Sequence, residues 1–187
     1  MLAEQLKKDT LTNHQQLEKM LVGRMKAIRT TQDYINLLQL FYSYFGGLEK
    51  LIDQHLDKSI LPDYDQRRKS ASLAHDITTL GGMPQELASG ASLPQISNAL
   101  QAMAALYVIE GSTLGGKFIS KMIAQQLKIT DSAGLSFFNS YGDNTDAMWN
   151  IFKSTLDNQS TQPQENMLVI QAANDTFARF KAWAERE

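Results

Sequence analysis

Apolar residues recur at intervals of three and four along almost the whole chain, and this spacing most strongly limits the folds open to it. It is typical of amphipathic α-helices, whereas half-buried strands alternate polar and apolar residues. Strict alternation over strand lengths is almost absent. The chain has 187 residues, which fits one domain with a substantial core. We therefore predict an all-α fold, a multi-helical bundle that forms a single domain over residues 1–187.

The same pattern places the individual helices. Thr31 is the expected N-cap of the second one, and Gly46-Gly47 is expected to bend or end it before the pattern resumes as far as Pro62. The stretch from Gly81 to Pro94 is the richest in loop-forming residues. The predicted helices cover residues 2–21, 31–45, 48–56, 64–80, 95–127, 135–138, 145–156 and 164–184.

Composition excludes several classes of function. The chain has no cysteine, so disulfides, thiolate metal sites and thiol nucleophiles are ruled out. Its net charge of -2 gives no sign of a surface for nucleic acid. The N-terminus does not look like a signal peptide, and no run of 18 or more apolar residues occurs. We expect a soluble cytoplasmic protein with neither a nucleic acid nor a membrane as its partner.

His14 lies in the first predicted helix, in line with the apolar residues of one face. Glu18 follows four positions later, so its carboxylate can reach the imidazole nitrogen that a bound metal leaves free. Thr10 lies one turn before His14. A histidine on an apolar helix face is also commonly a hydrogen-bonded core residue, so at this point a metal ligand and a core residue both stay open.

Gly111, Gly115 and Gly116 fall inside the longest predicted helix, where glycine is unfavourable. Each costs roughly 1 kcal/mol relative to alanine in a helix interior, so the three together cost roughly 3 kcal/mol. Three explanations remain open: close helix packing at Gly111 and Gly115, a kink at the Gly115-Gly116 pair, and direct contact of the backbone with a flat ligand. A phosphate-binding loop is not indicated, because no predicted strand precedes these glycines.

A helical histidine and a glycine-bearing helix together suggest that a planar metal cofactor lies between them. Heme fits this arrangement, because the macrocycle supplies four in-plane ligands and the protein needs only one axial histidine. The remaining histidines, His55 and His75, have no metal-ligand partner at helical spacing. A protein cage of several histidines is therefore not expected.

Three segments of the chain resemble the biliverdin-producing heme oxygenases, particularly the compact soluble bacterial type. The likeness extends over most of the chain, and it rests on the order and spacing of these segments. They are residues 6–18, with Leu6, Lys7, Thr10, His14 and Glu18; the run LYVIEGSTLGG at residues 106–116; and residues 134–152, with GLSFF, Tyr141, Gly142, Trp149 and Phe152.

The resemblance implies a role for each matching residue. His14 corresponds to the proximal iron ligand, Glu18 to the carboxylate that orients it, and the three glycines to the distal helix over the heme. Lys7 and Lys153 correspond to cations that pair with the heme propionates. The cofactor-binding residues expected in this way are Lys7, Thr10, His14, Glu18, Gly111, Gly115, Gly116 and Lys153, with His14 as the metal ligand and Gly111, Ser112 and Gly115 as catalytic residues.

The implied reaction is oxidative opening of heme b, at once cofactor and substrate, to biliverdin, carbon monoxide and ferrous iron. It requires O2 and an electron-donor protein of the ferredoxin or reductase type. Animal-type members carry an aspartate where this chain has Ser112, and Glu110 lies about 200° away around a helix. Two alternatives remain: a non-catalytic heme carrier or sensor, and a heme-free helical enzyme of thiaminase-like architecture.

Overall fold

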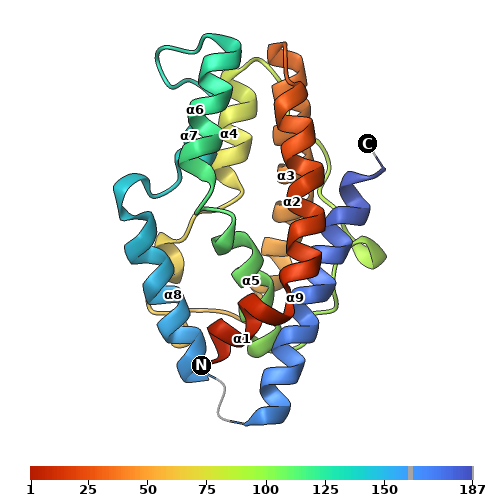
Figure 1. Cartoon of the computed structure of the whole chain (residues 1–187), viewed down its shortest axis with the longest axis vertical. Helices are drawn as coiled ribbons and strands as arrows, with labels where there is room; N and C mark the ends of the chain where they lie inside the picture. The colour runs from red at the N-terminus through yellow and green to blue at the C-terminus, as the bar shows by residue number, and fades with distance from the viewer. Residues whose placement is uncertain (160–161, 187) are drawn as a thin grey trace.

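The computed structural model describes residues 1–159 and 162–186, and within them the chain is all-α with no β-strand, as predicted. None of the helices in these residues is long and apolar enough to cross a membrane. Figure 1 shows an elongated bundle. Its helices are α1 (Leu2–Asp9), α2 (Leu11–Ala27), α3 (Thr31–Ile52), α4 (Ala71–Thr79), α5 (Ala99–Gly111), α6 (Gly116–Leu127), α7 (Ser136–Asn139), α8 (Thr145–Gln159) and α9 (Pro163–Ala184), with short 3-10 turns at Tyr64–Gln66, Gly90–Ser92 and Gly142–Asn144.

Helix α5 forms the buried centre of the bundle. Its residues 102–110 are all buried, and it contacts α3, α8 and α9. A helix that is apolar around its whole circumference must be covered on every side, which explains this central place. Helix α2 runs along α9, while α1 crosses the ends of α8 and α9 (Figure 1).

The predicted N-terminal helix over residues 2–21 is in fact two helices that meet at Thr10. The backbone there leaves ideal helical geometry (φ -102°, ψ -2°), and the Thr10 hydroxyl donates a 2.7 Å hydrogen bond to the Leu6 carbonyl. A threonine side chain that bonds the preceding turn competes with regular helix geometry. The change of direction allows α1 and α2 to contact different neighbours.

Helix α3 continues through Gly46 and Gly47, so the expected bend or end there is wrong. At both glycines, the loop that follows α4 instead packs closely against α3. A Cβ atom on Gly47 would lie 2.2 Å from the carbonyl oxygen of Ala88, and one on Gly46 would lie 2.6 Å from the Leu87 side chain. The Ala88 amide donates to the Ser43 carbonyl at 2.9 Å. Close packing against the Ala88 backbone therefore requires glycine at position 47, whereas at position 46 only the end of the Leu87 side chain is in the way.

Two other predicted helices are longer than the helices that the structure has there. The region predicted as a helix over residues 64–80 is a 3-10 turn, an extended Arg67 and then α4. The predicted helix over residues 95–127 starts only after Asn98, whose side chain caps α5, and it divides into α5 and α6. Residues 112–115 form turns between these two helices. Gly111, Gly115 and Gly116 thus lie at helix ends, where the cost of an interior glycine does not apply.

Candidate active site

A cavity of about 570 Å³ opens between α2 on one side and the α5–α6 junction on the other, with α1 and α8 at its rim. Its lining is mostly apolar, and the charged side chains in it are Glu4, Lys7, Glu18 and Lys153. This composition suits a ligand with a large hydrophobic body and a polar edge. The aromatic side chains in its lining are Phe41, Phe45, Tyr107, Phe118, Phe138, Trp149, Phe177 and Phe180.

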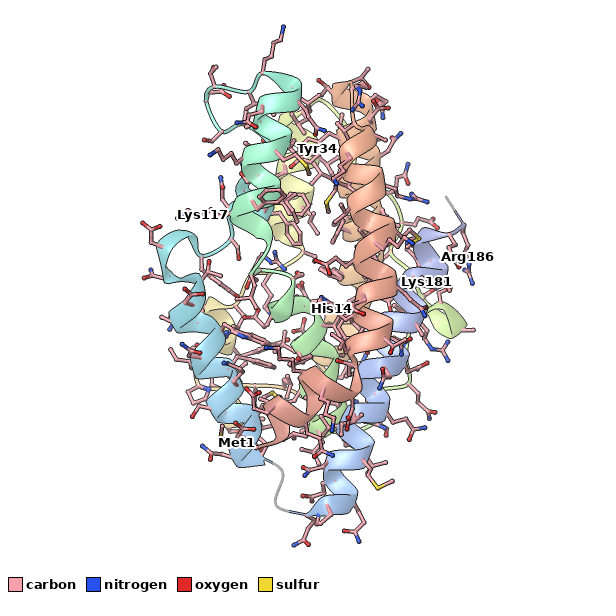
Figure 2. All side chains as sticks on the ribbon, viewed as in Figure 1. Met1, His14, Tyr34, Lys117, Lys181 and Arg186 are labelled. Atoms are coloured by element: carbon pink, nitrogen blue, oxygen red, sulfur yellow. The ribbon has the colours of Figure 1, made fainter. Side chains whose placement is uncertain are left out.

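His14 faces this cavity from α2, about midway along the molecule (Figure 2). Its side chain is exposed, makes an edge contact with the Phe177 ring at 5.6 Å, and has no hydrogen bond within the described part of the chain. Glu18 also lines the cavity, one helical turn further along α2. Among the hydrogen bonds of the described residues, none joins the side chains of His14 and Glu18. His14 is therefore not a hydrogen-bonded core residue, and its ring nitrogens are available to a ligand.

Gly111 and Gly115 form a flat part of the opposite wall. A Cβ atom on Gly111 would have Trp149 as its nearest neighbour at 3.9 Å, and one on Gly115 would have Ile119 at 3.8 Å. Packing within the protein therefore tolerates a side chain at both positions. A methyl group there would instead take up space in the cavity, which favours the third explanation for these glycines, contact with a flat ligand.

Gly116 has a different role, although it was predicted to contact the cofactor. It is buried, it does not belong to the cavity lining, and its Cβ atom would lie 2.1 Å from the Phe138 carbonyl oxygen. Such a contact is impossible for any residue with a side chain. Gly116 is explained by the close approach of α6 and α7, so we assign it no contact with a ligand.

Ser112 lines the cavity beside the glycines, and its hydroxyl is held by a residue that the sequence did not single out. Arg68 Nη2 donates to Ser112 Oγ at 2.6 Å and to the Ile109 carbonyl at 2.9 Å. The guanidinium also lies 3.9 Å from the centre of the Phe137 ring. Burial lowers the pKa of Arg68 to about 10, although nearby Glu110 partly opposes this shift. A buried arginine thus stands directly behind the cavity wall.

Glu110 points away from the cavity and into a buried ionic cluster. It accepts hydrogen bonds from Arg67 Nη1 at 2.7 Å and from the Tyr141 hydroxyl at 2.8 Å. The side chains of Arg67 and Glu110 are 0% and 1% exposed. Arg67 also pairs with Asp63, and the Tyr141 oxygen accepts from the Arg68 amide at 2.6 Å. The cluster therefore ties the segment after Pro62 to α5 and to the turn before α8.

Two lysines and a tyrosine gather where α1, α5 and α8 border the cavity. Lys7, Lys153 and Tyr107 all belong to the lining. Tyr107 packs on Trp149 at 5.4 Å between ring centres, and the Lys153 amine lies 5.8 Å from the same ring. Burial, and to a smaller extent the nearby Glu4 carboxylate, raise the pKa of Tyr107 to about 12, so its phenol keeps its proton and can donate a hydrogen bond even above pH 10. These donors fit the carboxylates of a bound ligand.

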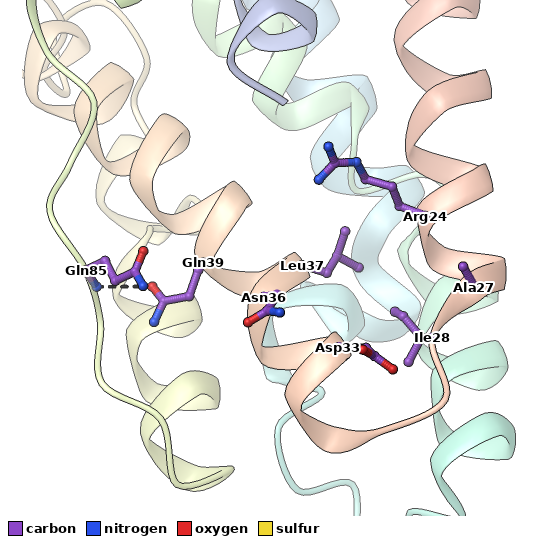
Figure 3. Close-up of a pocket in the computed structure, with 8 residues that line it drawn as sticks. All are labelled: Arg24, Ala27, Ile28, Asp33, Asn36, Leu37, Gln39 and Gln85. Carbon is purple, nitrogen blue, oxygen red and sulfur yellow. Dashed lines mark hydrogen bonds between the residues drawn. The ribbon is translucent and has the colours of Figure 1, made fainter. Parts of the chain in front are cut away.

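A second hollow, of about 410 Å³, lies between the end of α2 and the start of α3 (Figure 3). Its polar groups already serve the fold, because Asp33 caps α3 and the Gln39 side chain accepts a hydrogen bond from the Gln85 amide. It is therefore a packing feature. The residues around it are Arg24, Ala27, Ile28, Asp33, Asn36, Leu37, Gln39 and Gln85.

The donor groups of the larger cavity fit a cofactor that brings its own in-plane ligands. Within residues 1–159 and 162–186, no group of three or more histidine, aspartate or glutamate side chains could hold a metal ion. The cavity instead offers one histidine, two glycines across from it, and two lysines among charged residues that also include Glu4 and Glu18. This set fits heme, whose macrocycle supplies four ligands and whose propionates are anionic.

The chain is similar to known heme oxygenases. Heme oxygenase from Xanthomonas campestris pv. campestris is 26% identical over 147 residues, which are 79% of this chain and 86% of that protein. Heme oxygenase PigA of Pseudomonas aeruginosa is 26% identical over 178 residues, covering 94% and 88%.

Solved structures show the same fold. The heme oxygenase of Neisseria meningitidis, in NO- and CO-bound form, matches with a TM-score of 0.85 at 22% identity over 100% of this chain and 91% of that one. The heme oxygenase of Leptospira interrogans matches with a TM-score of 0.77 at 16% identity, covering 100% and 99%. The family model for heme oxygenase matches residues 1–186, and the chain therefore belongs to the heme oxygenase family of enzymes.

Proposed function

We propose that this enzyme opens heme b oxidatively to biliverdin, carbon monoxide and ferrous iron, using O2 and electrons from a ferredoxin-type or reductase-type protein. One observation carries the proposal. Gly111 and Gly115 have no packing reason to be glycine, and they line the same cavity as the unbonded imidazole of His14. An axial ligand and a flat wall in one cavity are what a heme substrate requires.

On the proximal side, His14 would ligate the iron through one ring nitrogen. Glu18 lies one helical turn away on the same side of α2, at a spacing from which its carboxylate would accept a hydrogen bond from the other nitrogen. That bond would fix the ring orientation and keep the imidazole neutral at the bound nitrogen. Thr10, whose hydroxyl bonds the Leu6 carbonyl, sets the start of the helix that carries both side chains.

On the distal side, Gly111 and Gly115 would leave room for O2 next to the ring. Ser112 Oγ accepts from Arg68 Nη2 at 2.6 Å and donates its own proton to the Ile109 carbonyl at 2.6 Å. Its oxygen would therefore accept a hydrogen bond from a water beside the ligand, and both bonds to Ser112 would fix the place of that water. Ser112 and Arg68 would thus serve in place of the aspartate of animal-type members.

At the entrance, Lys7, Lys153 and Tyr107 would hold the two propionates. Their elements, α1, α8 and α5, meet at one border of the cavity, so the propionate edge would face outward there. The opposite edge would then lie among the buried rings of Phe41, Phe45 and Phe180. The exposed edge is the natural entry point for electrons from a donor protein.

The test is a hemin titration followed by absorbance in the Soret region. We expect the unaltered protein to bind hemin with a histidine-ligated spectrum, and His14→Ala to lose that spectrum. His75→Ala, which removes an exposed histidine outside the cavity, is the matched control and should bind normally. Adding reductant in air should then produce biliverdin. Stable binding without biliverdin would indicate a carrier or sensor, and an unchanged spectrum in His14→Ala would disprove the ligand assignment.

A further inference from the structure

The active-site cavity continues along α2 well past His14. Its lining includes Leu21, Val22 and Met25, and Met25 is eleven residues after His14. Since an α-helix rises about 1.5 Å per residue, Met25 lies about 16 Å further along the helix axis than His14. Side chains on one helix all lean toward its start, so the offset between these two side chains is similar.

A heme ligated by His14 would not fill this length. A porphyrin lies at right angles to its axial ligand bond, and His14 projects sideways from α2 into the cavity, so the ring would extend along the helix. The methyl and vinyl groups of heme b lie well short of the axial distance between His14 and Met25. The cavity therefore extends beyond the edge of the macrocycle at Val22 and Met25.

Helix α6 supplies the opposite wall of this extension (Figure 1). Phe118, Ile119 and Met122 line the cavity from α6. The far ends of the two helices meet, because Gln126 Nε2 donates a 3.4 Å hydrogen bond to the Lys26 carbonyl. We call the part of the cavity between α2 and α6 the apolar annex. The residues that line it are Leu21, Val22, Met25, Phe118, Ile119 and Met122.

The apolar annex suits a slender hydrocarbon group. All six side chains are apolar, so they offer no partner to a charged or hydrogen-bonding group, whereas apolar surface gains free energy by leaving water there. The two methionines, Met25 and Met122, adapt to the shape of an irregular apolar occupant. Phe118 is 73% exposed, so the annex opens to solvent beside this ring. A chain that lies in the annex therefore need not end inside it.

We propose that this enzyme accepts hemes that carry a long isoprenoid or alkyl chain in place of a vinyl group, and that the apolar annex holds this chain. The inference rests on the proposed function, because ligation by His14 fixes where the macrocycle lies. With the propionates at α1 and α8, the edge away from them faces along α2 toward the annex. Heme b has only methyl and vinyl groups on that edge, whereas a longer chain would cover Val22 and Met25.

Two hemes that differ in one substituent test the proposal. The probes are hemin and the ferric form of heme o, in which a hydroxyethylfarnesyl chain replaces one vinyl group. We expect the unaltered protein to bind both with a histidine-ligated Soret spectrum, and to bind heme o at least as tightly as hemin. Val22→Trp places an indole in the annex, so it should weaken heme o binding about tenfold or more and hemin binding less than about threefold. Weaker binding of heme o than of hemin to the unaltered protein would overturn the proposal.

The matched control is Met167→Trp. Met167 is 69% exposed on α9 and lies outside the cavity, so this variant should bind both hemes as the unaltered protein does. Equal weakening of both hemes in Val22→Trp would also overturn the proposal. If Val22→Trp does not fold, Met122→Trp fills the annex from α6, and the same comparison decides.

Turnover separates this inference from the proposed function. With reductant and air, hemin should yield biliverdin, and heme o should yield a bilin that keeps its chain, which mass spectrometry identifies. If both hemes bind and only heme o binding depends on Val22, but neither ring opens, the proposed reaction fails and the role of the annex stands. If hemin yields biliverdin and heme o does not bind, the role of the annex fails and the proposed reaction stands.

Discussion

Arg68 Nη2 donates a 2.6 Å hydrogen bond to Ser112 Oγ and so joins the segment after Pro62 to the wall of the active-site cavity. The two residues are 44 positions apart and come from separate elements. Arg68 also bonds the Ile109 and Phe137 carbonyls. A single buried side chain therefore connects α5, α7 and the α5–α6 turn, and the position of Ser112 depends on all three.

Removing a charge from the buried ion pair between Arg67 and Glu110 should destabilise the protein more than removing one from an exposed ion pair. Glu110→Gln removes one of the two carboxylates that pair with the buried Arg67 guanidinium and leaves Asp63 as the other, so we expect the free energy of unfolding to fall by about 2 kcal/mol. Lys117 and Asp143 form an ion pair that is 80% and 95% exposed, and Asp143→Asn should change stability by less than about 1 kcal/mol. Urea denaturation of both variants measures the difference, and similar losses would contradict the prediction.

Substitutions at Gly115 and Gly116, which are adjacent in the chain, should separate an effect on hemin binding from an effect on stability. Gly116→Ala places a methyl group against the Phe138 carbonyl, so it should lower the free energy of unfolding by about 2 kcal/mol or more. Gly115→Ala meets no protein atom closer than 3.8 Å and should alter stability by less than about 1 kcal/mol. It should nevertheless weaken hemin binding about tenfold, which is about 1.4 kcal/mol. Unaltered hemin affinity in Gly115→Ala would count against the glycine wall as a ligand surface.

Replacing two other glycines by alanine should change the stability of the protein in opposite directions. Gly23 lies exposed within α2 with no atom near its missing Cβ, so Gly23→Ala should stabilise the protein by about 1 kcal/mol. For a chain of this size, this corresponds to a melting temperature higher by about 2–4 °C. Gly47→Ala would collide with the Ala88 carbonyl and should cost about 2–3 kcal/mol. Thermal unfolding followed by circular dichroism checks both, and a stabilised Gly47→Ala would disprove the close contact.

High pH should destabilise the fold through its buried tyrosines. Burial raises the pKa of Tyr107 to about 12, and it also raises, as the largest cause, the pKa values of Tyr34, Tyr44, Tyr64 and Tyr141. Above the ordinary value of 10.0 the unfolded chain releases protons that the folded chain keeps, so stability falls as pH rises. The lowered pKa of Arg68 has the opposite effect above about pH 10, because the unfolded chain then keeps a proton that the folded chain has released. This single arginine is outweighed by the five tyrosines.

Urea midpoints measured from about pH 8 to about pH 11 should therefore decrease. The rise in tyrosinate absorbance should coincide with the loss of helix seen by circular dichroism, because the buried phenols ionise only on unfolding. A midpoint that stays constant over this range would show that the buried phenols do not control alkaline stability.

The fold class and most helices could be predicted from periodicity, whereas the places where helices break could not. Thr10 fits a continuous helix by spacing, and only its hydrogen bond to the preceding turn and the different neighbours of α1 and α2 explain the break. Gly46 and Gly47 look like helix breakers, yet they lie against Leu87 and Ala88, about 40 residues away, and the Ala88 carbonyl leaves no room for a side chain at Gly47. Long-range packing determines where a helix breaks and where glycine is required, and the spacing of apolar residues carries no information about such packing.

The site was predictable where its residues share one helix. His14 and Glu18 are close because they are four positions apart on α2, and Ser112 lies beside Gly111 in sequence. Arg67 and Arg68 had no such signal, since they stand in a polar run and reach α5 only through the tertiary fold. Lys7 and Lys153 do line the cavity, although only the family resemblance had suggested so.

The place of Trp149 makes the cavity visible to fluorescence. The chain has two tryptophans, and Trp149 lines the cavity between Tyr107 and Phe152. Trp183 lies outside it and donates a 3.0 Å hydrogen bond to the Ser43 hydroxyl. A Trp183→Phe variant therefore keeps Trp149 as its single tryptophan. A porphyrin bound in the cavity would quench the fluorescence of Trp149 by energy transfer, so the intrinsic fluorescence of this variant would report ligand binding without an added label.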